Sequence, residues 1–462
     1  MRQLFGTDGI RGVAGEAPLD ETTVYAVGLA LAHQLRPAAM AKAVETGTIA
    51  PRLILGRDTR ESSPWIARML TAGLRAGGAE VESAGVVPTP AIAYLAKKHG
   101  FDAGVVISAS HNPWQDNGIK VFGGDGKKLP DATELAIEEV IFKHALTSEA
   151  PALETLPALE DRSEYATEYV AFLLDSVPQL TLNGLKIVVD CANGAAAPIA
   201  PRLFAELHRR GGGDVTMLNV APNGKNINAD CGALHPKTVA AEAAARGVQI
   251  GITFDGDADR CLFAGAGNNV INGDAILLMA ARDLQARGLL TGDVVVATTM
   301  SNMGLEAALK RSGITMLRAA VGDRYVLEMM QTRNAALGGE QSGHILFPHL
   351  ATTGDGLLTA LVVLDLIART GKTIEELTAD LKVFPQVIVN VKVREKKPLL
   401  EIPAVAETIA AAEEELKDSG RVVIRYSGTE ALARVMIEAE DEARMRFHAE
   451  SIAESIRKEL GV

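Results

Sequence analysis

The sequence is poor in cysteine, in aromatic residues and in long apolar runs. Its 462 residues include only three cysteines, which form no Cys-x-x-Cys pair, so neither a disulfide framework nor a zinc site is expected. Aromatic residues make up 4%, which argues against a stacking surface for single-stranded nucleic acid. No apolar run approaches the ~20 residues of a membrane helix, and no signal segment is apparent. We therefore expect a cytoplasmic protein without a membrane partner.

Basic charge is also in deficit. The formal net charge of −12 disfavours nucleic acid and anionic membrane surfaces as partners. If the substrate is itself an anion, it must be bound by cations gathered locally or by helix N-termini. A Gly-x-x-x-x-Gly-Lys nucleotide loop is absent from the whole sequence.

What is present is an ordinary globular composition in a chain too long for one core. Short buried strands are predicted at Leu53–Leu55, Gly104–Ile107, Lys186–Val189, Gln249–Phe254 and Val294–Thr298. Helices are predicted between them at Pro64–Ala76, Thr238–Ala245 and Asp274–Arg287. This alternation favours α/β layers. The last ~80 residues combine a period-2 segment, Gln386–Val393, with a charged helix, Val405–Lys417, and strands Arg421–Tyr426 and Arg434–Glu438, which favours a smaller α+β unit.

A polar loop, Ile107-Ser108-Ala109-Ser110-His111-Asn112-Pro113, follows the predicted strand Gly104–Ile107. α/β proteins place ligands at such strand ends, although a capped surface turn would explain these residues equally well. A serine hydrolase is disfavoured because the Gly-x-Ser-x-Gly elbow is missing. In an extended chain His111 would point away from Ser110, so we do not expect the two to pair.

A second loop, Asp255-Gly256-Asp257-Ala258-Asp259-Arg260, comes directly after the strand Gln249–Phe254. Three carboxylates at alternate positions repel one another unless a cation lies among them, and oxygen ligands favour magnesium or calcium. An EF-hand is excluded because Arg260 occupies its glycine position. An acidic solvent loop is the alternative.

Three further loops carry polar groups. Gly338-Gly339-Glu340-Gln341-Ser342-Gly343-His344 can approach a polyhydroxylated ligand, although a plain glycine turn is as good an explanation. Arg425-Tyr426-Ser427-Gly428-Thr429-Glu430, with Arg434 beyond it, has the composition of an anion cradle. Phe5-Gly6-Thr7-Asp8-Gly9-Ile10-Arg11-Gly12 presents one arginine among three glycines and is a weak signal alone.

Together the five loops resemble the α-D-phosphohexomutase family, in the family's order and over nearly the whole chain. The opening segment, Glu340–His344, Asp323-Arg324-Tyr325-Val326 and Thr352-Thr353-Gly354-Asp355-Gly356 are most similar to its bacterial phosphoglucosamine mutase branch. There are departures: Tyr426 stands where the branch often has Lys, and Ala431 where it often has Pro. Segment Pro37–Pro51 is slightly long for the family, and we expect it to be a surface loop.

The resemblance implies three α/β three-layer domains and a smaller C-terminal α+β domain around a central cleft. We place the domains at residues 1–150, 151–264, 265–381 and 382–462. The implied activity interconverts glucosamine 6-phosphate and glucosamine 1-phosphate through a phosphoserine and a 1,6-bisphosphate, feeding amino-sugar nucleotide and cell-wall precursor synthesis. Phosphomannomutase or phosphoglucomutase activity and a non-catalytic sugar-phosphate sensor are the alternatives, and a homodimer is left open.

The resemblance also implies roles for individual residues. The catalytic set is Ser110, Lys120, Arg11 and His344, and the metal set, for Mg²⁺, is Ser110, Asp255, Asp257 and Asp259. The substrate-binding set is Arg260, Glu340, Ser342, Arg425, Ser427, Gly428, Thr429 and Arg434. Lys120 is expected to act as acid or base with a pKa lowered by neighbouring cations.

Overall fold

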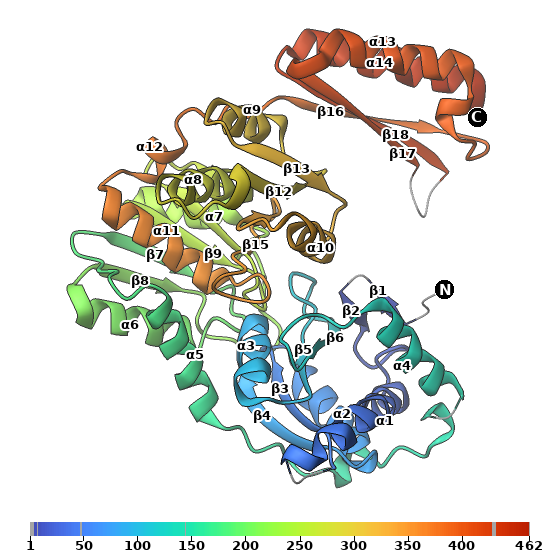
Figure 1. Cartoon of the computed structure of the whole chain (residues 1–462), viewed down its shortest axis with the longest axis vertical. Coiled ribbons are helices and arrows are strands. Elements are labelled where there is room, and N and C mark those ends of the chain that lie inside the picture. The colour runs from blue at the N-terminus through green and yellow to red at the C-terminus, as the bar shows by residue number, and fades with distance from the viewer. Residues whose placement is uncertain (1–3, 7, 47–48, 144, 427–430, 462) are drawn as a thin grey trace. The chain divides into compact units, whose positions relative to one another are not determined.

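The computed structural model describes residues 4–6, 8–46, 49–143, 145–426 and 431–461 of the chain (Figure 1). The chain forms two compact units. One comprises residues 1–299 and 317–379, and the other comprises residues 300–316 and 380–462. Within the described ranges, no helix combines the length and the apolar character needed to cross a membrane.

The first sheet of the larger unit has six strands in the order β1-β2-β6-β5-β3-β4. Their bounds are β1 Phe5–Gly6, β2 Gly9–Val13, β3 Arg52–Arg57, β4 Glu80–Val86, β5 Ala103–Ile107 and β6 Asp116–Gly123. Helices α1 (Glu21–Thr46), α2 (Ser63–Ala76) and α4 (Asp131–Lys143) contribute to the core on one face of this sheet, and α3 (Thr89–His99) lies on the other (Figure 1). Covered on both faces, β5 is buried at every position, as its continuous apolar run predicts.

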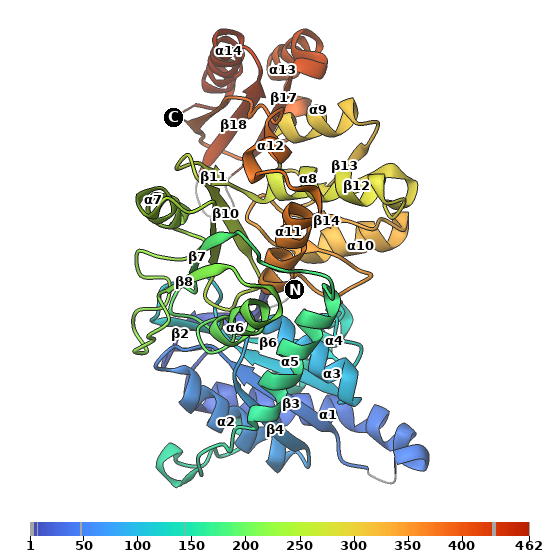
Figure 2. The same cartoon turned by 90° about the vertical axis from the view of Figure 1, so that its left-hand side faces the viewer.

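The second sheet has the order β11-β10-β9-β7-β8. Its strands are β7 Lys186–Asp190, β8 Asp214–Leu218, β9 Ile250–Phe254, β10 Cys261–Gly265 and β11 Val270–Ile271. Its accompanying helices are α5 Ser163–Ser176, α6 Ala200–Gly211 and α7 Pro236–Arg246 (Figure 2). Strands β9 and β10 pair antiparallel with Phe254 opposite Cys261, so the Asp255–Arg260 loop is the tip of a buried hairpin.

The third sheet has the order β13-β12-β14-β15. Its strands are β12 Val294–Thr298, β13 Thr315–Ala319, β14 Gly338–Gly339 and β15 Ile345–Leu346. The helices of this part of the chain are α8 Gly273–Ala286, α9 Met303–Arg311, α10 Asp323–Arg333, α11 Gly356–Thr370 and α12 Ile374–Thr378. Strands β14 and β15 pair antiparallel, so Glu340–His344 forms the turn between them.

The smaller unit contains an antiparallel sheet of order β16-β18-β17. Its strands are β16 Gln386–Lys392, β17 Gly420–Tyr426 and β18 Leu432–Ala439. Helices α13 (Pro403–Leu416) and α14 (Glu442–Leu460) bury their apolar sides against this sheet, with Val435 and Ile452 fully buried between the layers. In the described part of the chain, the remaining helical turns are η1 Ala145–Thr147, η2 Leu153–Thr155, η3 Thr291–Asp293, η4 Leu399–Glu401 and η5 Lys417–Ser419.

The α/β class and the C-terminal α+β unit are confirmed, and the strand predicted at Val294–Thr298 has those bounds. One local prediction is wrong. Segment Pro37–Pro51 is helical as far as Thr46, because α1 continues through Pro37 into alanine-rich sequence of high helix propensity. After the Ser110 loop, residues 116–120 open strand β6, where Gly118 pairs with Arg11 of β2.

Candidate active site

Ser110 lies in the loop after β5, with its hydroxyl directed at the acidic loop. The residue is buried, and its Oγ donates a hydrogen bond of 2.6 Å to Asp255 Oδ2, although 145 positions separate the two residues. The Ser110 backbone has a φ of 53°, in the left-handed region that side chains other than glycine rarely adopt. The two loops predicted to act together are therefore in direct contact.

The left-handed backbone at Ser110 also overturns the prediction for His111. That prediction assumed an extended chain, in which neighbouring side chains point to opposite sides. Instead, His111 Nδ1 lies 3.3 Å from Ser110 Oγ. Burial, followed by the positive charges of Arg260 and Arg11, lowers the pKa of His111 to about 4, so the imidazole is neutral at pH 7.

Asp255, Asp257 and Asp259 converge as predicted. All three are buried, and one carboxylate oxygen from each lies within 4.8 Å of the others. Among the described residues, Asp257 Oδ1 and Asp259 Oδ1 have no hydrogen-bond partner. Ala258, between them, has a φ of 56°, which keeps the loop tightly curved.

The electrostatics of the acidic loop favour a cation. Burial, followed by the charges of Asp259 and Asp257, raises the pKa of Asp255 to about 8. Buried carboxylates that repel one another and present oxygens without a hydrogen bond fit a hard divalent ion. The residues present therefore fit a metal ion at this position.

Lys120, on β6, lies within the acidic cluster rather than among cations. Its Nζ is 2.8 Å from Asp257 Oδ2, 3.0 Å from Asp8 Oδ2 and 3.5 Å from Asp259 Oδ2. Burial alone would lower the pKa of Lys120, but Asp257, Asp8 and Asp259 outweigh it and raise the pKa well above its ordinary value. The expected lowering of this pKa is therefore wrong for the protein without a bound cation.

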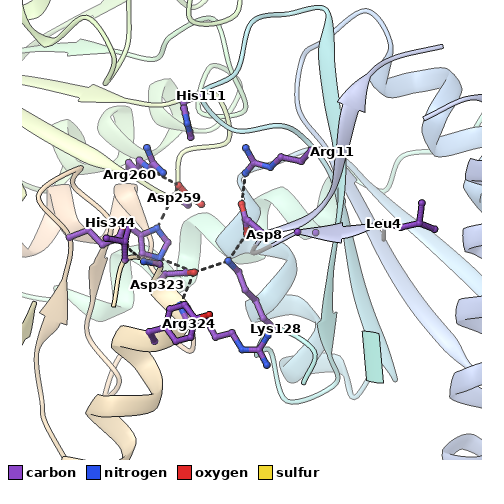
Figure 3. Close-up of a pocket in the computed structure, with 16 residues that line it drawn as sticks. Leu4, Asp8, Arg11, His111, Lys128, Asp259, Arg260, Asp323, Arg324 and His344 are labelled. Carbon is purple, nitrogen blue, oxygen red and sulfur yellow. Dashed lines mark hydrogen bonds and ion pairs between the residues drawn. The ribbon is translucent and has the colours of Figure 1, made fainter. Parts of the chain in front are cut away.

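A cavity of about 410 Å³ opens beside the acidic loop. Of the predicted residues, Arg11, Arg260, Glu340 and His344 line it. Figure 3 shows charged side chains of alternating sign around this cavity, running in the order Arg11, Asp8, Lys128, Asp323, His344, Asp259 and Arg260. We call this series the charged ring. It supplies the local cations that the acidic chain needs for an anionic ligand.

His344 connects two carboxylates of the charged ring. Its Nδ1 lies 3.6 Å from Asp259 Oδ1, and its Nε2 lies 3.5 Å from Asp323 Oδ2. Burial opposes protonation, but Asp259 and Asp323 together raise the pKa of His344 to about 9. The imidazole is therefore a cation at neutral pH and adds to the anion-binding character of the cavity.

The turn between β14 and β15 offers only part of what was predicted. Glu340 lines the cavity, where its Oε1 accepts a hydrogen bond from the Gly322 amide. Ser342 Oγ donates to Glu340 Oε2 at 3.2 Å. Gln341 donates to Asp274 Oδ2 at the start of α8 and is not among the residues that line the cavity, so it contributes to the position of the turn.

The predicted phosphate loop falls largely outside the described residues, which omit Ser427, Gly428 and Thr429. In the smaller unit, Arg425 of β17 lies opposite Arg434 of β18 in the sheet register. Tyr426, one of the departures from the family pattern, donates its hydroxyl hydrogen to the Lys397 carbonyl.

Sequence reasoning missed Asp8, Lys128 and Thr89. Lys128 contacts both Asp8 and Asp323, although these lie 120 and 195 positions away. Thr89, at the start of α3, donates its hydroxyl hydrogen to Asp257 Oδ2 and its amide hydrogen to the Asp257 carbonyl. Asp8 and Asp323 stand in two of the sequence motifs, but no role was predicted for either. A charged residue among apolar residues or glycines was the signal that could have identified them. Nothing local distinguishes Lys128 from its neighbour Lys127.

Comparisons with known proteins cover the whole chain. Four sequence models of the phosphoglucomutase/phosphomannomutase family match it: alpha/beta/alpha domain I at residues 2–148, domain II at 164–267, domain III at 272–384 and the C-terminal domain at 388–455. A phosphoglucosamine mutase of Koribacter versatilis is 56% identical, covering 100% of this chain and 98% of the relative. One of Geotalea daltonii is 46% identical, covering 100% and 99%.

Solved structures share the fold. A phosphoglucomutase/phosphomannomutase family protein of Burkholderia thailandensis superimposes with a TM-score of 0.77 at 24% identity, covering 99% of this chain and 98% of that one. The N-acetylphosphoglucosamine mutase of Aspergillus fumigatus, solved in complex with GlcNAc-6P and magnesium, gives a TM-score of 0.65 at 20% identity, covering 99% and 96%. From its sequence relatives and its four domain matches, this chain belongs to the phosphoglucomutase/phosphomannomutase family, the α-D-phosphohexomutases.

Proposed function

We propose that the chain is an isomerase that interconverts glucosamine 6-phosphate and glucosamine 1-phosphate through a phosphorylated Ser110. The observation that carries this proposal is the 2.6 Å contact between Ser110 Oγ and Asp255 beside two further buried carboxylates. The choice of glucosamine is supported by full-length relatives at 44–56% identity that are named phosphoglucosamine mutase.

In this proposal, the O1 hydroxyl of the 6-phosphate attacks the phosphorus on Ser110 Oγ. The bond from phosphorus to Oγ breaks, the bond to O1 forms, and the O1 proton passes to a base. The resulting 1,6-bisphosphate reorients in the cavity, so that its two phosphates exchange places. Ser110 Oγ then attacks the phosphorus on O6. The bond from phosphorus to O6 breaks, O6 takes up the proton that O1 released, and the phosphoserine is regenerated with glucosamine 1-phosphate as the product. The reaction has no net phosphoryl donor, as an isomerisation requires.

The acidic loop would hold Mg²⁺ through Asp255, Asp257 and Asp259, with the Ser110 oxygen as a further ligand. When bound, the ion neutralises charge on the transferring phosphoryl group. Lys120 is the proposed acid or base, because its Nζ lies next to the acidic loop and its side chain is only 3% exposed. A divalent cation among the three aspartates would offset the carboxylate charge that raises the Lys120 pKa in the absence of the ion. Arg11 and His344 stabilise the charge of the phosphoryl group from the cavity wall.

The remaining predicted residues bind the sugar phosphate in the same proposal. Arg260 and Glu340 line the cavity, and Ser342 holds Glu340 toward it. Arg425, Ser427, Gly428, Thr429 and Arg434 would bind the phosphate that is not reacting. Because the bisphosphate must reorient between the two transfers, these groups would bind each of its phosphates at a different stage.

We also propose a cytoplasmic location. All three cysteines, Cys191, Cys231 and Cys261, are buried free thiols. Unpaired cysteines are typical of proteins kept in a reducing compartment.

The central test is the variant Ser110→Ala. We expect turnover to fall to background while the melting temperature stays within a few degrees of the parent, because only one hydroxyl is removed. Intact-mass measurement should find one phosphoryl group on the parent and none on the variant. Turnover by the variant at the parental rate would refute the phosphoserine pathway.

The sugar is tested separately by comparing kcat/KM on glucosamine, mannose and glucose 6-phosphates. We expect glucosamine 6-phosphate to be preferred. The descriptions of the matching family models keep phosphomannomutase and phosphoglucomutase activity as the second candidate. A higher kcat/KM on mannose or glucose 6-phosphate would select it.

A further inference from the structure

The left-handed backbone of Ser110 requires support from elsewhere in the molecule. Serine, unlike glycine, carries a Cβ that disfavours a φ of 53°. The surroundings of Ser110 must therefore impose this conformation. It also determines the direction of Oγ, because rotating this one residue back to an extended φ would turn the side chain away from Asp255. The groups that bind the Ser110 backbone therefore control the nucleophile.

Arg60 is the first of these groups. Its side chain is fully buried, and Nη2 donates to the carbonyl of Ser110 at 3.1 Å and to that of Asn112 at 2.6 Å. Its Nη1 forms an ion pair with Asp58, which is also fully buried. Asp58 Oδ2 in turn accepts a hydrogen bond of 2.6 Å from Ser108 Oγ, and that hydroxyl accepts one of 3.0 Å from the Ser110 amide.

Asn228 is the second group and comes from the loop between β8 and α7, beside the second sheet. Its Nδ2 donates to the same Ser110 carbonyl at 3.0 Å. The Asn228 amide donates to the Ala192 carbonyl at 2.9 Å, which anchors the residue, and Asn228 is only 6% exposed. A Cβ at Gly256 would lie 2.4 Å from the Ser110 oxygen, so the acidic loop encloses this carbonyl on a third side.

We propose that Arg60 and Asn228 are positioning residues for phosphoryl transfer, which jointly fix the Ser110 carbonyl and so aim Oγ at the acidic loop. Neither is among the residues that line the 410 Å³ cavity, so neither is expected to touch the sugar phosphate. This inference rests on the proposed phosphoserine pathway. It predicts a defect in kcat that leaves KM unchanged.

The sharpest test is Asn228→Asp. Asn228 has a φ of 57°, which aspartate also tolerates. The variant keeps the shape of the side chain but places an oxygen against the Ser110 carbonyl in place of an N–H donor. We expect kcat to fall about 10- to 100-fold because the nucleophile is misplaced, with KM for glucosamine 6-phosphate within twofold of the parent.

The matched control is Asn193→Asp. Asn193 also has a positive φ, 49°, and is 7% exposed, but its Nδ2 donates to the Asn226 carbonyl rather than to Ser110. We expect its kcat to stay within twofold of the parent. If both variants lose kcat equally, or if Asn228→Asp loses kcat only in proportion to a lowered melting temperature, the positioning role is wrong.

Arg60→Lys provides the second measurement. It retains a positive charge beside Asp58, which protects the fold, but one ammonium group cannot reproduce the guanidinium fork that reaches both carbonyls. We expect the ³¹P resonance of the phosphoserine to shift in Arg60→Lys and in Asn228→Asp but not in Asn193→Asp. An unchanged resonance and an unchanged kcat in both test variants would overturn the inference.

Ser110→Ala, assayed in parallel, separates this inference from the proposed function. If Ser110→Ala turns over normally, both are wrong. If Ser110→Ala is inactive while Asn228→Asp and Arg60→Lys match the control, the phosphoserine pathway stands and only the positioning role fails.

Discussion

The Ser110 loop and the charged ring lie side by side but are held by different forces. Neutral and charge-assisted hydrogen bonds to backbone atoms fix the loop, through Arg60 and Asn228. Ion pairs between side chains hold the ring, above all those of Lys128 with Asp8 and Asp323. Buried hydrogen bonds to the backbone specify one geometry, whereas ion pairs around an open cavity can exchange partners with an incoming anion.

This difference suits the two tasks that the proposed reaction sets. The nucleophile must return to one position twice in each cycle, before and after the bisphosphate turns over. The charged ring must accept the substrate in two orientations. Cations that each contact several carboxylates suit this task, because they can exchange a carboxylate for a phosphate. The comparison predicts that changes to the loop and its acidic partner affect kcat, and that changes to the ring affect KM.

The largest expected effect comes from the acidic loop. Asp257→Asn should lower kcat about 10³-fold, because it removes one carboxylate from a site whose ion stabilises the transition state by several kcal/mol. Excess EDTA should abolish turnover of the parent, and added Mg²⁺ should restore it. Asp365→Asn, on α11 and paired with Arg369, is the control and should retain full activity. Full activity of the parent in EDTA would contradict a metal-dependent reaction.

The charged ring is tested by Lys128→Met. Removing this ammonium group leaves Asp8 and Asp323 facing the cavity without their shared cation, so an anionic substrate is repelled. We expect KM to rise about 10-fold, roughly the 1.4 kcal/mol of one lost charge contact, with kcat within threefold. The exposed neighbour Lys127→Met serves as the control and should leave both constants unchanged. If Lys128→Met instead lowers kcat at constant KM, the charged ring and the Ser110 loop do not differ in the way proposed.

The last prediction concerns Asp355, which caps α11 and lies between glycines that touch the charged ring and the acidic loop. A Cβ at Gly354 would lie 2.3 Å from His344, and the Gly356 amide donates to the Ala258 carbonyl. Burial raises the pKa of Asp355 to about 6, against the opposing hydrogen bonds from Leu358 and Tyr169. Stability from this group is therefore complete below about pH 4 and is lost as the pH rises through 6.

The matching measurement is the free energy of unfolding from pH 4 to pH 7. Relative to Asp355→Asn, the parent should lose up to about 3 kcal/mol over this range. Tyr169→Phe, which removes a hydrogen-bond donor to Asp355 Oδ2, should make the loss larger. Parallel stability curves for the parent and Asp355→Asn would show that the carboxyl group does not titrate in this window.

Much of the site was predictable because its loops follow buried apolar strands. Ser110 follows β5 and Asp255 follows β9, so the sequence alone places their chemistry at strand ends. The pairing of Ser110 with His111 could not be predicted, because serine carries no sequence signal for a left-handed backbone. The shift of the Lys120 pKa was predicted with the wrong sign, because charge in the sequence gives no distances. Three carboxylates lie within 3.5 Å of Nζ, and their charges outweigh that of Arg11.

Arg60 and Asn228 both bind the Ser110 carbonyl, and this has a consequence for the order in which the site forms during synthesis. During translation the first sheet can be complete while residues 228 and 255 are still unmade, and at that stage Ser110 has neither its second anchor nor its acidic partner. The geometry that directs Ser110 Oγ at the acidic loop is therefore complete only after the second sheet has formed.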